Sequence, residues 1–398
     1  MFKNKTIILG ITGSIAAYKI ANLASMLSKQ HADIHVIMTK NATNFINPIT
    51  FETLTGNKCL VDTFDRNFEF SVEHVSLAKK ADIMLIAPCS ANVIGKMAGG
   101  IADDMLTTTF LACKCPVYIS PAMNTNMYEN SIVQENIEKL KKHGIKIIEP
   151  ATGLLACKDV GKGKMPECDI LFDYIYNEIA FEKILSGKNI MISAGPTVES
   201  LDPVRFISNH STGKMGYAIA KIAAAMGANV TLITGPTNIK KPLFMNKIVE
   251  ITSAADMFEA VKDNYDTQDI VIKSAAVADF TPKHFSDEKI KKKDSKNTIE
   301  LESTKDILKY LGENKKDQIL CGFSMETEHL INNSRVKLEK KNLNMIVANN
   351  LKTEGAGFSV DTNVVTLITN SEIKELPIMP KEMVAKEILT YIHDNFIK

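Results

Sequence analysis

The chain of 398 residues contains no tryptophan, only three arginines, and no uninterrupted apolar run of the roughly 18 residues that a membrane helix needs. Its seven cysteines form no Cys-x-x-Cys pair, and no histidines or further cysteines at zinc-site spacing accompany Cys113 and Cys115. Glycine and proline, with 20 and 13 residues, are too few for a disordered or fibrous chain. These absences argue against a membrane-spanning or disulfide-stapled protein and favour the reducing cytoplasm.

Charge of one sign is not in excess in either half of the chain. Lysine and arginine number 47 and aspartate and glutamate 46, and division after Ser186 leaves 19 basic and 19 acidic residues before it and 28 and 27 after it. This balance predicts neither nucleic acid nor a membrane surface as a partner. The first residues imitate a secretion signal, but Gly10, Gly13 and Ser14 interrupt the apolar run, so a first strand and helix are favoured.

Short apolar segments alternate with longer helical patterns, such as 17–29 and 215–226, which predicts an α/β protein with parallel sheets. The expected strands are 6–9, 34–38, 83–87, 117–120, 145–148, 189–193, 230–234, 270–273, 319–322, 345–348 and 364–368. The strand–turn–helix pattern starts again near Ser186 and Gly187. We therefore expect two Rossmann-like domains, 1–186 and 187–398, each with a strand-to-helix turn suited to phosphate.

Several segments of the first half place polar and small residues after predicted strands. They are 10–17 (GITGSIAA), 87–92 (APCSAN) and 121–128 (PAMNTNMY), and a glycine-rich segment at 153–165 (GLLACKDVGKGKM) fits a mobile flap. The first is not a Gly-x-Gly-x-x-Gly fingerprint. Taken singly, His74 reads as a helix cap, Asn124 as a turn former and Cys157 as a packed residue. Their order along one sheet edge is what favours a site.

On these segments, residues 1–180 resemble the flavin-containing cysteine decarboxylases, which implies a flavodoxin-like domain that binds FMN. Tyr128 and Lys164 depart from the Trp and Arg that many relatives have, and the lysine lacks a bidentate grip. By the resemblance, His74 is the base or the residue that handles the thiol, Asn124 binds the substrate carboxylate and Cys157 donates a proton. The resemblance also implies that the flavin is held by Gly13, Ser14, Ile15, Thr39, Ser90 and Asn92.

The implied chemistry explains why a flavin is needed. Loss of carbon dioxide from an amino-acid amide carboxylate leaves a carbanion with no adjacent electron sink. Oxidation of the side-chain thiol to a thioaldehyde, with FMN accepting the electrons, creates that sink. Decarboxylation then gives an enethiol, which is protonated and reduced.

The second half has its own set of segments after predicted strands. Residues 193–197 (SAGPT) precede 202–216 (DPVRFISNHSTGKMG), and 274–280 (SAAVADF), 288–293 (EKIKKK) and 322–327 (GFSMET) follow. A Walker A reading of Gly213 and Lys214 fails, because Ser208 replaces the first glycine and Met215 replaces Ser or Thr. The lysine run fits a solvated face or, alternatively, a mobile loop that stabilises phosphoryl charge.

These segments resemble phosphopantothenate–cysteine ligase over about 187–398, so the whole chain resembles the bacterial bifunctional proteins of coenzyme A biosynthesis. The resemblance implies CTP and Mg²⁺, with an acyl-cytidylate formed from 4′-phosphopantothenate and then attacked by the amine of cysteine. Lys289 would steady the triphosphate, and Asn209 and Arg205 would hold the acyl intermediate. The remaining nucleotide contacts that it implies are Ala275, Asp279, Phe323, Lys337 and Lys341.

Two alternatives stay open. One is a decarboxylase whose second half is inactive, and the other is a regulatory module that binds flavin or nucleotide without turnover. The families also imply a homo-oligomer, with trimers of the first half and dimers of the second, which together would build a dodecamer.

Overall fold

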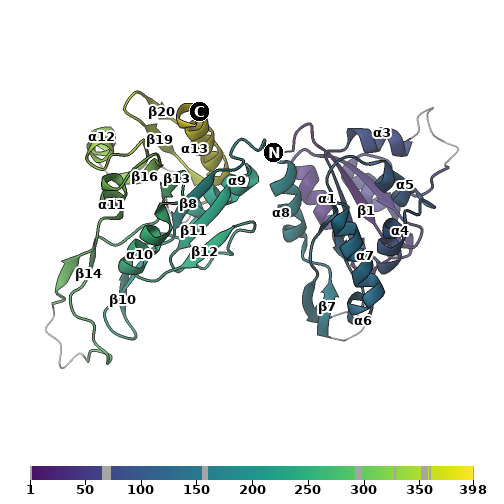
Figure 1. Ribbon diagram of the computed structural model, residues 1–398, viewed down its shortest axis with the longest axis horizontal. Helices are drawn as coiled ribbons and strands as arrows, with labels where there is room; N and C mark the ends of the chain where they lie inside the picture. The colour runs from purple at the N-terminus through teal and green to yellow at the C-terminus, as the bar shows by residue number, and fades with distance from the viewer. Residues whose placement is uncertain are drawn as a thin grey trace. The chain divides into compact units, whose positions relative to one another are not determined.

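The structure, a computed structural model, describes residues 2–64, 73–154, 160–291, 298–326, 329–350, 357 and 360–397. The chain divides into two compact units, Met1–Phe181 and Glu182–Lys398. Each unit is built around its own sheet (Figure 1). No helix in the described ranges is long and apolar enough to cross a membrane.

Unit 1 contains five parallel strands in the order β2-β1-β3-β4-β5, which is the flavodoxin-like order. All residues of β1, β3 and β4 are buried, as expected for a parallel sheet covered on both faces. The prediction of these strands from the sequence is confirmed. Their bounds are β1 Thr6–Ile11, β2 Asp33–Met38, β3 Ile83–Cys89, β4 Val117–Pro121 and β5 Lys146–Ile147.

Helices cover both faces of this sheet. Helix α1 packs with α2 and α8, whereas α4, α5 and α7 enclose the apolar cluster on the other face. The expected helix over 17–29 is divided into a 3₁₀ turn, η1, and α1. The bounds are η1 Ile15–Lys19, α1 Ile20–Lys29, η2 Ala42–Asn44, α2 Pro48–Thr55, α3 Glu73–Lys80, α4 Ala91–Gly99, α5 Met105–Ala112, α6 Thr125–Glu129, α7 Ser131–Lys142 and α8 Cys168–Ile179.

Unit 2 has an eight-stranded sheet in the order β12-β11-β8-β13-β16-β17-β19-β20. The first six strands are parallel and follow the doubly wound dinucleotide-binding order. The sheet is mixed at one edge, where β19 runs antiparallel to β17 and β20 runs antiparallel to β19, to which a short turn joins it. The bounds are β8 Asn189–Ala194, β11 Asn229–Thr234, β12 Lys247–Glu250, β13 Ile270–Lys273, β16 Ile319–Glu326, β17 Met345–Asn350, β19 Val365–Ile368 and β20 Ile373–Glu375.

Among the described residues of unit 2, five helices flank the sheet. Helices α9 and α13 pack together on one face, and α10, α11 and α12 enclose an apolar cluster on the other. The helices are α9 Lys214–Ala225, α10 Ala254–Tyr265, α11 Ile307–Glu313, α12 Leu330–Lys340 and α13 Lys381–Phe396. Short antiparallel pairs complete the units: β6 Ala151–Leu154 with β7 Val160–Lys164, β9 Val198–Ser200 with β10 Phe206–Ser208, β14 Phe280–Pro282 with β15 Leu301–Ser303, and β18 Thr362–Asn363 with β21 Met379–Pro380.

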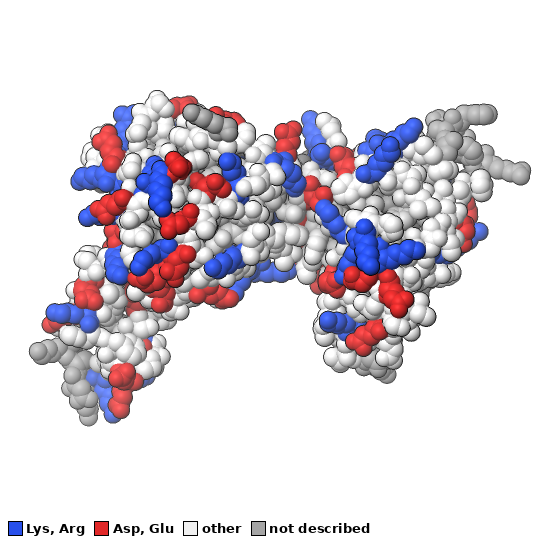
Figure 2. Space-filling view, viewed as in Figure 1, with Lys and Arg blue, Asp and Glu red and all other residues white. Residues whose placement is uncertain are grey.

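Both sheets reverse their strand order at one point, between β1 and β3 in unit 1 and between β8 and β13 in unit 2. Ligands of open α/β sheets bind beyond the carboxyl ends of the strands at such a point. Basic and acidic side chains are interspersed on the face of each unit in Figure 2. The topology therefore directs attention to the loops after β1, β3, β4, β8 and β13.

Candidate active sites

A cleft of about 1290 Å³ opens at the carboxyl edge of the unit 1 sheet. All six residues predicted to hold the flavin line it, and Asn124 and Lys164 do so as well. The remaining lining residues come mostly from the loops after β2, β3 and β4 and from η1 and β7. They include Tyr18, Lys19, Lys40, Asn41, Lys96, Asp103, Asp104, Met123 and Met127. Residues that were predicted from separate sequence segments therefore line one cavity.

The loops after β1 and β3 are joined through Thr12, a fully buried residue. Its hydroxyl donates to Pro88 O at 2.7 Å and accepts from the backbone N–H of Ser90 at 2.9 Å. The Thr12 N–H also donates to Pro88 O, at 3.3 Å. This threonine lies within the predicted 10–17 segment, but only its burial and its contacts across the chain reveal a positioning role.

Replacing Thr12 with valine is expected to loosen both loops, because the Ser90 N–H loses its acceptor at a nearly dry position. An unmade buried hydrogen bond costs about 1–3 kcal/mol, so we expect unfolding at lower denaturant and weaker flavin retention. Thr12→Ser keeps the hydroxyl and is the matched control. Flavin titration of both variants tests the expectation, and equal retention by Thr12→Val and wild type would contradict it.

The strand-to-helix turn after β1 also shapes the cleft. Gly13 leaves no room for a side chain, since an added Cβ would lie 2.7 Å from Cβ of Asn41. Ser14 caps η1 by accepting from the N–H of Ala16 at 3.4 Å. Thr39, buried directly after β2, donates its N–H to Ile11 O at 3.0 Å. A glycine turn with nearby hydroxyl groups suits the phosphate of a flavin nucleotide.

The hairpin of β6 and β7 reaches the same cleft through the Met123–Asn124 loop. The Met123 N–H donates to Gly163 O at 3.0 Å, and Leu154, Gly163, Lys164 and Met165 line the cavity. Asn124 caps α6, with Oδ1 accepting from the N–H of Asn126 at 2.9 Å. Cys157, the predicted proton donor, lies outside the residues that the structure describes.

The two departures from the family pattern have distinct surroundings. Tyr128 is buried and its hydroxyl donates to Glu149 Oε2 at 3.0 Å; burial and this carboxylate raise the pKa of Tyr128 to about 12. Lys164 lies 3.7 Å from Glu167, to which Lys19 donates at 3.0 Å. The hydrogen bond from Lys19 lowers the pKa of Glu167. These contacts tie the end of β7 to η1.

His74 does not join the other predicted residues of unit 1. It is half-buried in the first turn of α3 and is not among the described residues that line the cleft. Residues missed by sequence reasoning include Lys96, which donates to Asp103 Oδ1 at 2.7 Å on the cleft wall. Its place in a helix gave no signal in the sequence.

In unit 2, Asn209 is held at the carboxyl edge of the sheet. Its Nδ2 donates to Ala276 O at 3.0 Å, and the Ala276 N–H donates to Gly195 O at 3.0 Å. Residues after β8, β10 and β13 are therefore in direct contact. Asn209 thus contacts the residue that follows Ala275, so two of the predicted positions lie close together.

Ile290, which follows Lys289, is held by a buried carboxylate that sequence reasoning did not single out. Asp202 Oδ2 accepts from Arg205 Nε at 2.9 Å and from Nη2 at 2.6 Å, and also from the N–H of Ile290 at 3.2 Å. Arg205 Nη2 donates further to Ile290 O. Burial acts to raise the pKa of Asp202, but hydrogen bonds from Val204 and Arg205 hold it well below its usual range. Lys289, next to Ile290, is exposed.

The predicted nucleotide residues follow neighbouring strands. Ala275 and the exposed Asp279 come after β13, and the half-buried Phe323 lies in β16, next to β13 in the sheet. Lys337 is exposed on α12, and Lys341 at its end lies 2.9 Å from Asp306 Oδ2. In the described ranges, no group of three or more His, Cys, Asp or Glu side chains is arranged to hold a metal ion.

Two family models match the chain. The model described as "Flavoprotein" matches residues 1–180, and the one described as "DNA/pantothenate metabolism flavoprotein C-terminal domain" matches residues 185–396.

Curated relatives cover nearly the whole chain. A coenzyme A biosynthesis bifunctional protein of Bacillus subtilis is 48% identical over 98% of this chain and 97% of its own length. Its counterpart in Borreliella burgdorferi is 44% identical over 99% of this chain and 100% of its own length. A protein named cysteine/cysteine sulfinic acid decarboxylase is 45% identical over 87% of this chain and 100% of its own length.

Proposed function

The chain belongs to the family of bifunctional coenzyme A biosynthesis proteins, and we propose that its two units use CTP and FMN for consecutive steps. Unit 2 joins cysteine to 4′-phosphopantothenate, and unit 1 decarboxylates the product to 4′-phosphopantetheine. The observation that carries the proposal for unit 1 is the convergence of its six predicted flavin residues on one cleft.

In unit 1, Gly13, Ser14 and Ser90 would hold the flavin phosphate, and Ile15, Thr39 and Asn92 would contact the rest of the cofactor. When bound, FMN supplies a two-electron acceptor that later returns the electrons. Asn124 presents its amide to the substrate carboxylate from the cleft wall, and Lys164 adds positive charge nearby. Cys157 would donate the proton to the product.

In unit 2, Lys289 would stabilise charge on the triphosphate while the carboxylate of 4′-phosphopantothenate attacks the α-phosphorus. Asn209 and Arg205 would hold the acyl-cytidylate for attack by the amine of cysteine. Ala275, Asp279, Phe323, Lys337 and Lys341 would bind the nucleotide. Mg²⁺ would enter with the triphosphate, its usual partner in nucleotide sites.

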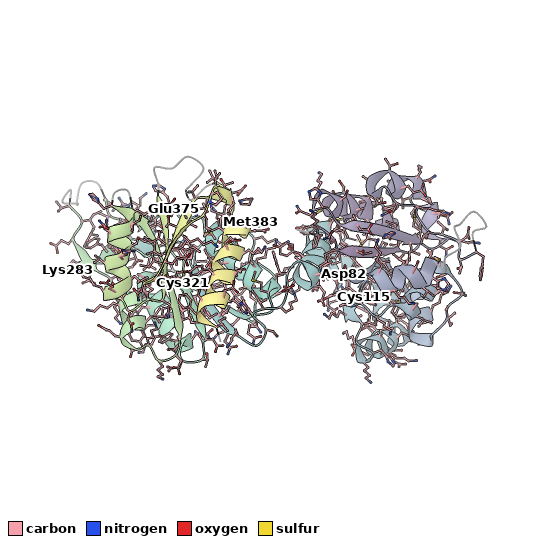
Figure 3. All side chains as sticks on the ribbon, turned by 90° about the horizontal axis from the view of Figure 1, so that it is seen from above. Asp82, Cys115, Lys283, Cys321, Glu375 and Met383 are labelled. Carbon is pink, nitrogen blue, oxygen red and sulfur yellow. The ribbon has the colours of Figure 1, made fainter. Side chains whose placement is uncertain are left out.

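Replacing Lys289 with glutamine is expected to slow pyrophosphate release by about 100-fold or more, because a charged donor to the phosphoryl oxygens is lost. Lys283, also exposed but outside the predicted set, provides the control Lys283→Gln (labelled in Figure 3). Pyrophosphate release with CTP and 4′-phosphopantothenate measures the effect. Release by Lys289→Gln at the wild-type rate would show that its assigned role is wrong.

The relative named for cysteine and cysteine sulfinic acid favours a second candidate substrate class for unit 1. Mass spectrometry of products decides between them. The proposed function expects 4′-phosphopantetheine from CTP, cysteine and 4′-phosphopantothenate, with a flavin absorbance band in the pure protein. Decarboxylation of free cysteine without pyrophosphate release would instead support a decarboxylase with an inactive second unit, and bound ligand without any product would support a regulatory module.

We further propose that the chain works as a cytoplasmic homo-oligomer, with trimers of unit 1 and dimers of unit 2. Five large apolar side chains that line the cleft of unit 1 are exposed in the single chain: Ile15, Tyr18, Phe64, Met127 and Leu154. Apolar surface around a site is typical of a contact with another copy. In such an oligomer, His74 of one copy would reach the cleft of a neighbouring copy, because it does not line the cleft of its own chain.

A further inference from the structure

Two cysteines of unit 1, separated by a single residue, have no role in the functions assigned so far. Cys113 and Cys115 are partly exposed, whereas the other four cysteines among the described residues are buried. Neither of the two is among the described residues that line the cleft of unit 1. Two neighbouring thiols that both reach solvent can react in sequence with one disulfide, which a single packed cysteine cannot do.

The pair lies at the amino edge of the unit 1 sheet, opposite the edge that carries the cleft. Cys113 directly follows α5, and its N–H donates to Thr109 O at 3.0 Å. Cys115 lies two residues before β4, and the next residue, Pro116, accepts at its carbonyl oxygen from the N–H of Met84 in β3 at 3.0 Å. The backbone is therefore held by hydrogen bonds on both sides of the pair.

The spacing of the two cysteines suits a disulfide between them. Cα atoms two positions apart are at most about 7 Å from each other, when the chain is fully extended. Any departure from full extension brings them into the range of about 4.4–6.8 Å that a disulfide needs. Both side chains pack against the same apolar cluster, on the face of the sheet that α4, α5 and α7 cover. Their sulfur atoms therefore lie on one side of the chain.

The two thiols differ in acidity because they hydrogen-bond to each other. The Cys113 thiol donates to Cys115, which lowers the pKa of Cys115 and raises the pKa of Cys113. Burial and the carboxylate of Asp82 oppose the lowering at Cys115 (Asp82 and Cys115 are labelled in Figure 3). Asp82 is itself engaged by Lys5 Nζ at 3.1 Å and by the N–H of Thr6 at 2.8 Å. Cys115 is therefore the thiol that ionises first, while Cys113 stays protonated beside it.

We propose that Cys113 and Cys115 form a thiol–disulfide exchange site for disulfides of small aminothiols, the class to which cystine belongs. The Cys115 thiolate attacks one sulfur of the small disulfide, so that a mixed disulfide forms and a thiolate leaves. That thiolate takes the proton of Cys113, whose sulfur then attacks the Cys115 sulfur and expels the second thiol. The protein dithiol is thus oxidised by two electrons to a disulfide, and the small disulfide is reduced to two thiols.

The proposed function brings such disulfides into contact with the protein. Its substrate cysteine and its product 4′-phosphopantetheine are both thiols, and oxidation of either gives a disulfide of this class. This choice of reaction partner rests on the proposed function, whereas the reactivity of the pair does not. Because excess thiol reverses the exchange, the state of the pair follows the ratio of thiol to disulfide around the protein.

The test is incubation of the full-length protein without CTP, with cystine in one arm and the disulfide of 4′-phosphopantetheine in another. Free thiols are then alkylated, and cleavage after phenylalanine and tyrosine releases the fragment 111–118, which contains no other cysteine than the pair. We expect the wild-type fragment to lose the mass of two hydrogen atoms and to resist alkylation. Dithiothreitol should restore both thiols. Reaction in either arm supports the proposal, and the faster arm identifies the preferred disulfide.

Serine variants separate the roles of the two thiols. Cys113→Ser should stop at the mixed disulfide on Cys115, because the second thiol is missing, and Cys115→Ser should keep Cys113 as a free thiol. The fully buried Cys321, whose pKa burial raises, is the internal control and should react at least about 10-fold more slowly in every sample.

Two results would overturn the proposal: a wild-type fragment that keeps both free thiols in both arms, or equal formation of mixed disulfide in the two serine variants. The measurement uses no CTP and records no turnover. Failure of the exchange would therefore leave the proposed function intact, and failure of pyrophosphate release or decarboxylation would leave the reactivity of the cysteine pair intact.

Discussion

Gly163→Ala is expected to abolish decarboxylation while leaving ligation intact. Gly163 has a φ of 132°, a region open almost only to glycine. An added Cβ would also collide with the carbonyl oxygen of Met123, whose N–H bonds to Gly163 O. The hairpin of β6 and β7 must then leave the Met123–Asn124 loop. A displacement of about 1 Å at a reacting centre costs on the order of 100-fold in rate, so we expect at least that loss.

The chain contains a control for the backbone effect alone. Gly144, between α7 and β5, also has a positive φ, 84°, but an added Cβ there meets no atom within 4 Å. Gly144→Ala should cost about 1 kcal/mol of stability and leave both activities unchanged. Carbon dioxide release from 4′-phosphopantothenoylcysteine and pyrophosphate release from CTP are the two measurements. Normal decarboxylation by Gly163→Ala would show that the close contact with Met123 is not needed.

Asn209→Asp is expected to abolish amide formation while CTP still binds. The Asn209 amide is held by its donation to Ala276 O at 3.0 Å. An ionised carboxylate has no donor, so in Asn209→Asp two acceptors would face each other and the side chain would turn away. The same change places a negative charge where the acyl-cytidylate, itself anionic, must be held. Loss of one positioned donor of this kind costs about 100- to 1000-fold in rate.

Asn314→Asp provides the matched control, because Asn314 Nδ2 also donates to a backbone carbonyl, Tyr310 O at 2.8 Å. Asn314 lies at the C-terminal end of α11 and is not a predicted site residue. That variant should ligate normally. Isotope exchange between CTP and pyrophosphate, nucleotide binding and final product are measured separately for both variants. If Asn209→Asp formed the amide at the wild-type rate, the proposed role of Asn209 would have to be abandoned.

The buried strands of both units were predictable because burial on two faces leaves a direct trace in the sequence, whereas β12 and β20, which lie at the two edges of the unit 2 sheet, were not predicted. The residues of β1, β3 and β4 are uniformly buried, so each segment is almost wholly apolar. The turn after β1 was predictable from Gly13 and Ser14. The antiparallel addition of β19 and β20 was not, because strand direction depends on how the connection closes and not on the apolar pattern.

The residues of the candidate sites also include some that the sequence marks and some that it does not. Residues such as Ser90, Asn124 and Asn209 lie in segments whose polar composition after a strand marks them, and their predicted roles remain to be tested by the experiments above. Thr12 and Asp202 lie in such segments too, but nothing in the sequence set them apart from their neighbours. Each is buried, and its significance comes from groups far away in the sequence: Ser90 for Thr12 and Ile290 for Asp202.

The sequence by itself determined that this protein has two α/β units and which loops follow the carboxyl ends of their strands, since apolar periodicity and turn residues are local properties of a chain. Tertiary structure alone decided which buried polar groups are satisfied and which are not. That decision depends on desolvation and on partners supplied by other elements, and neither can be read until the chain has folded. The paired carboxylate of Asp202 is such an outcome in this molecule.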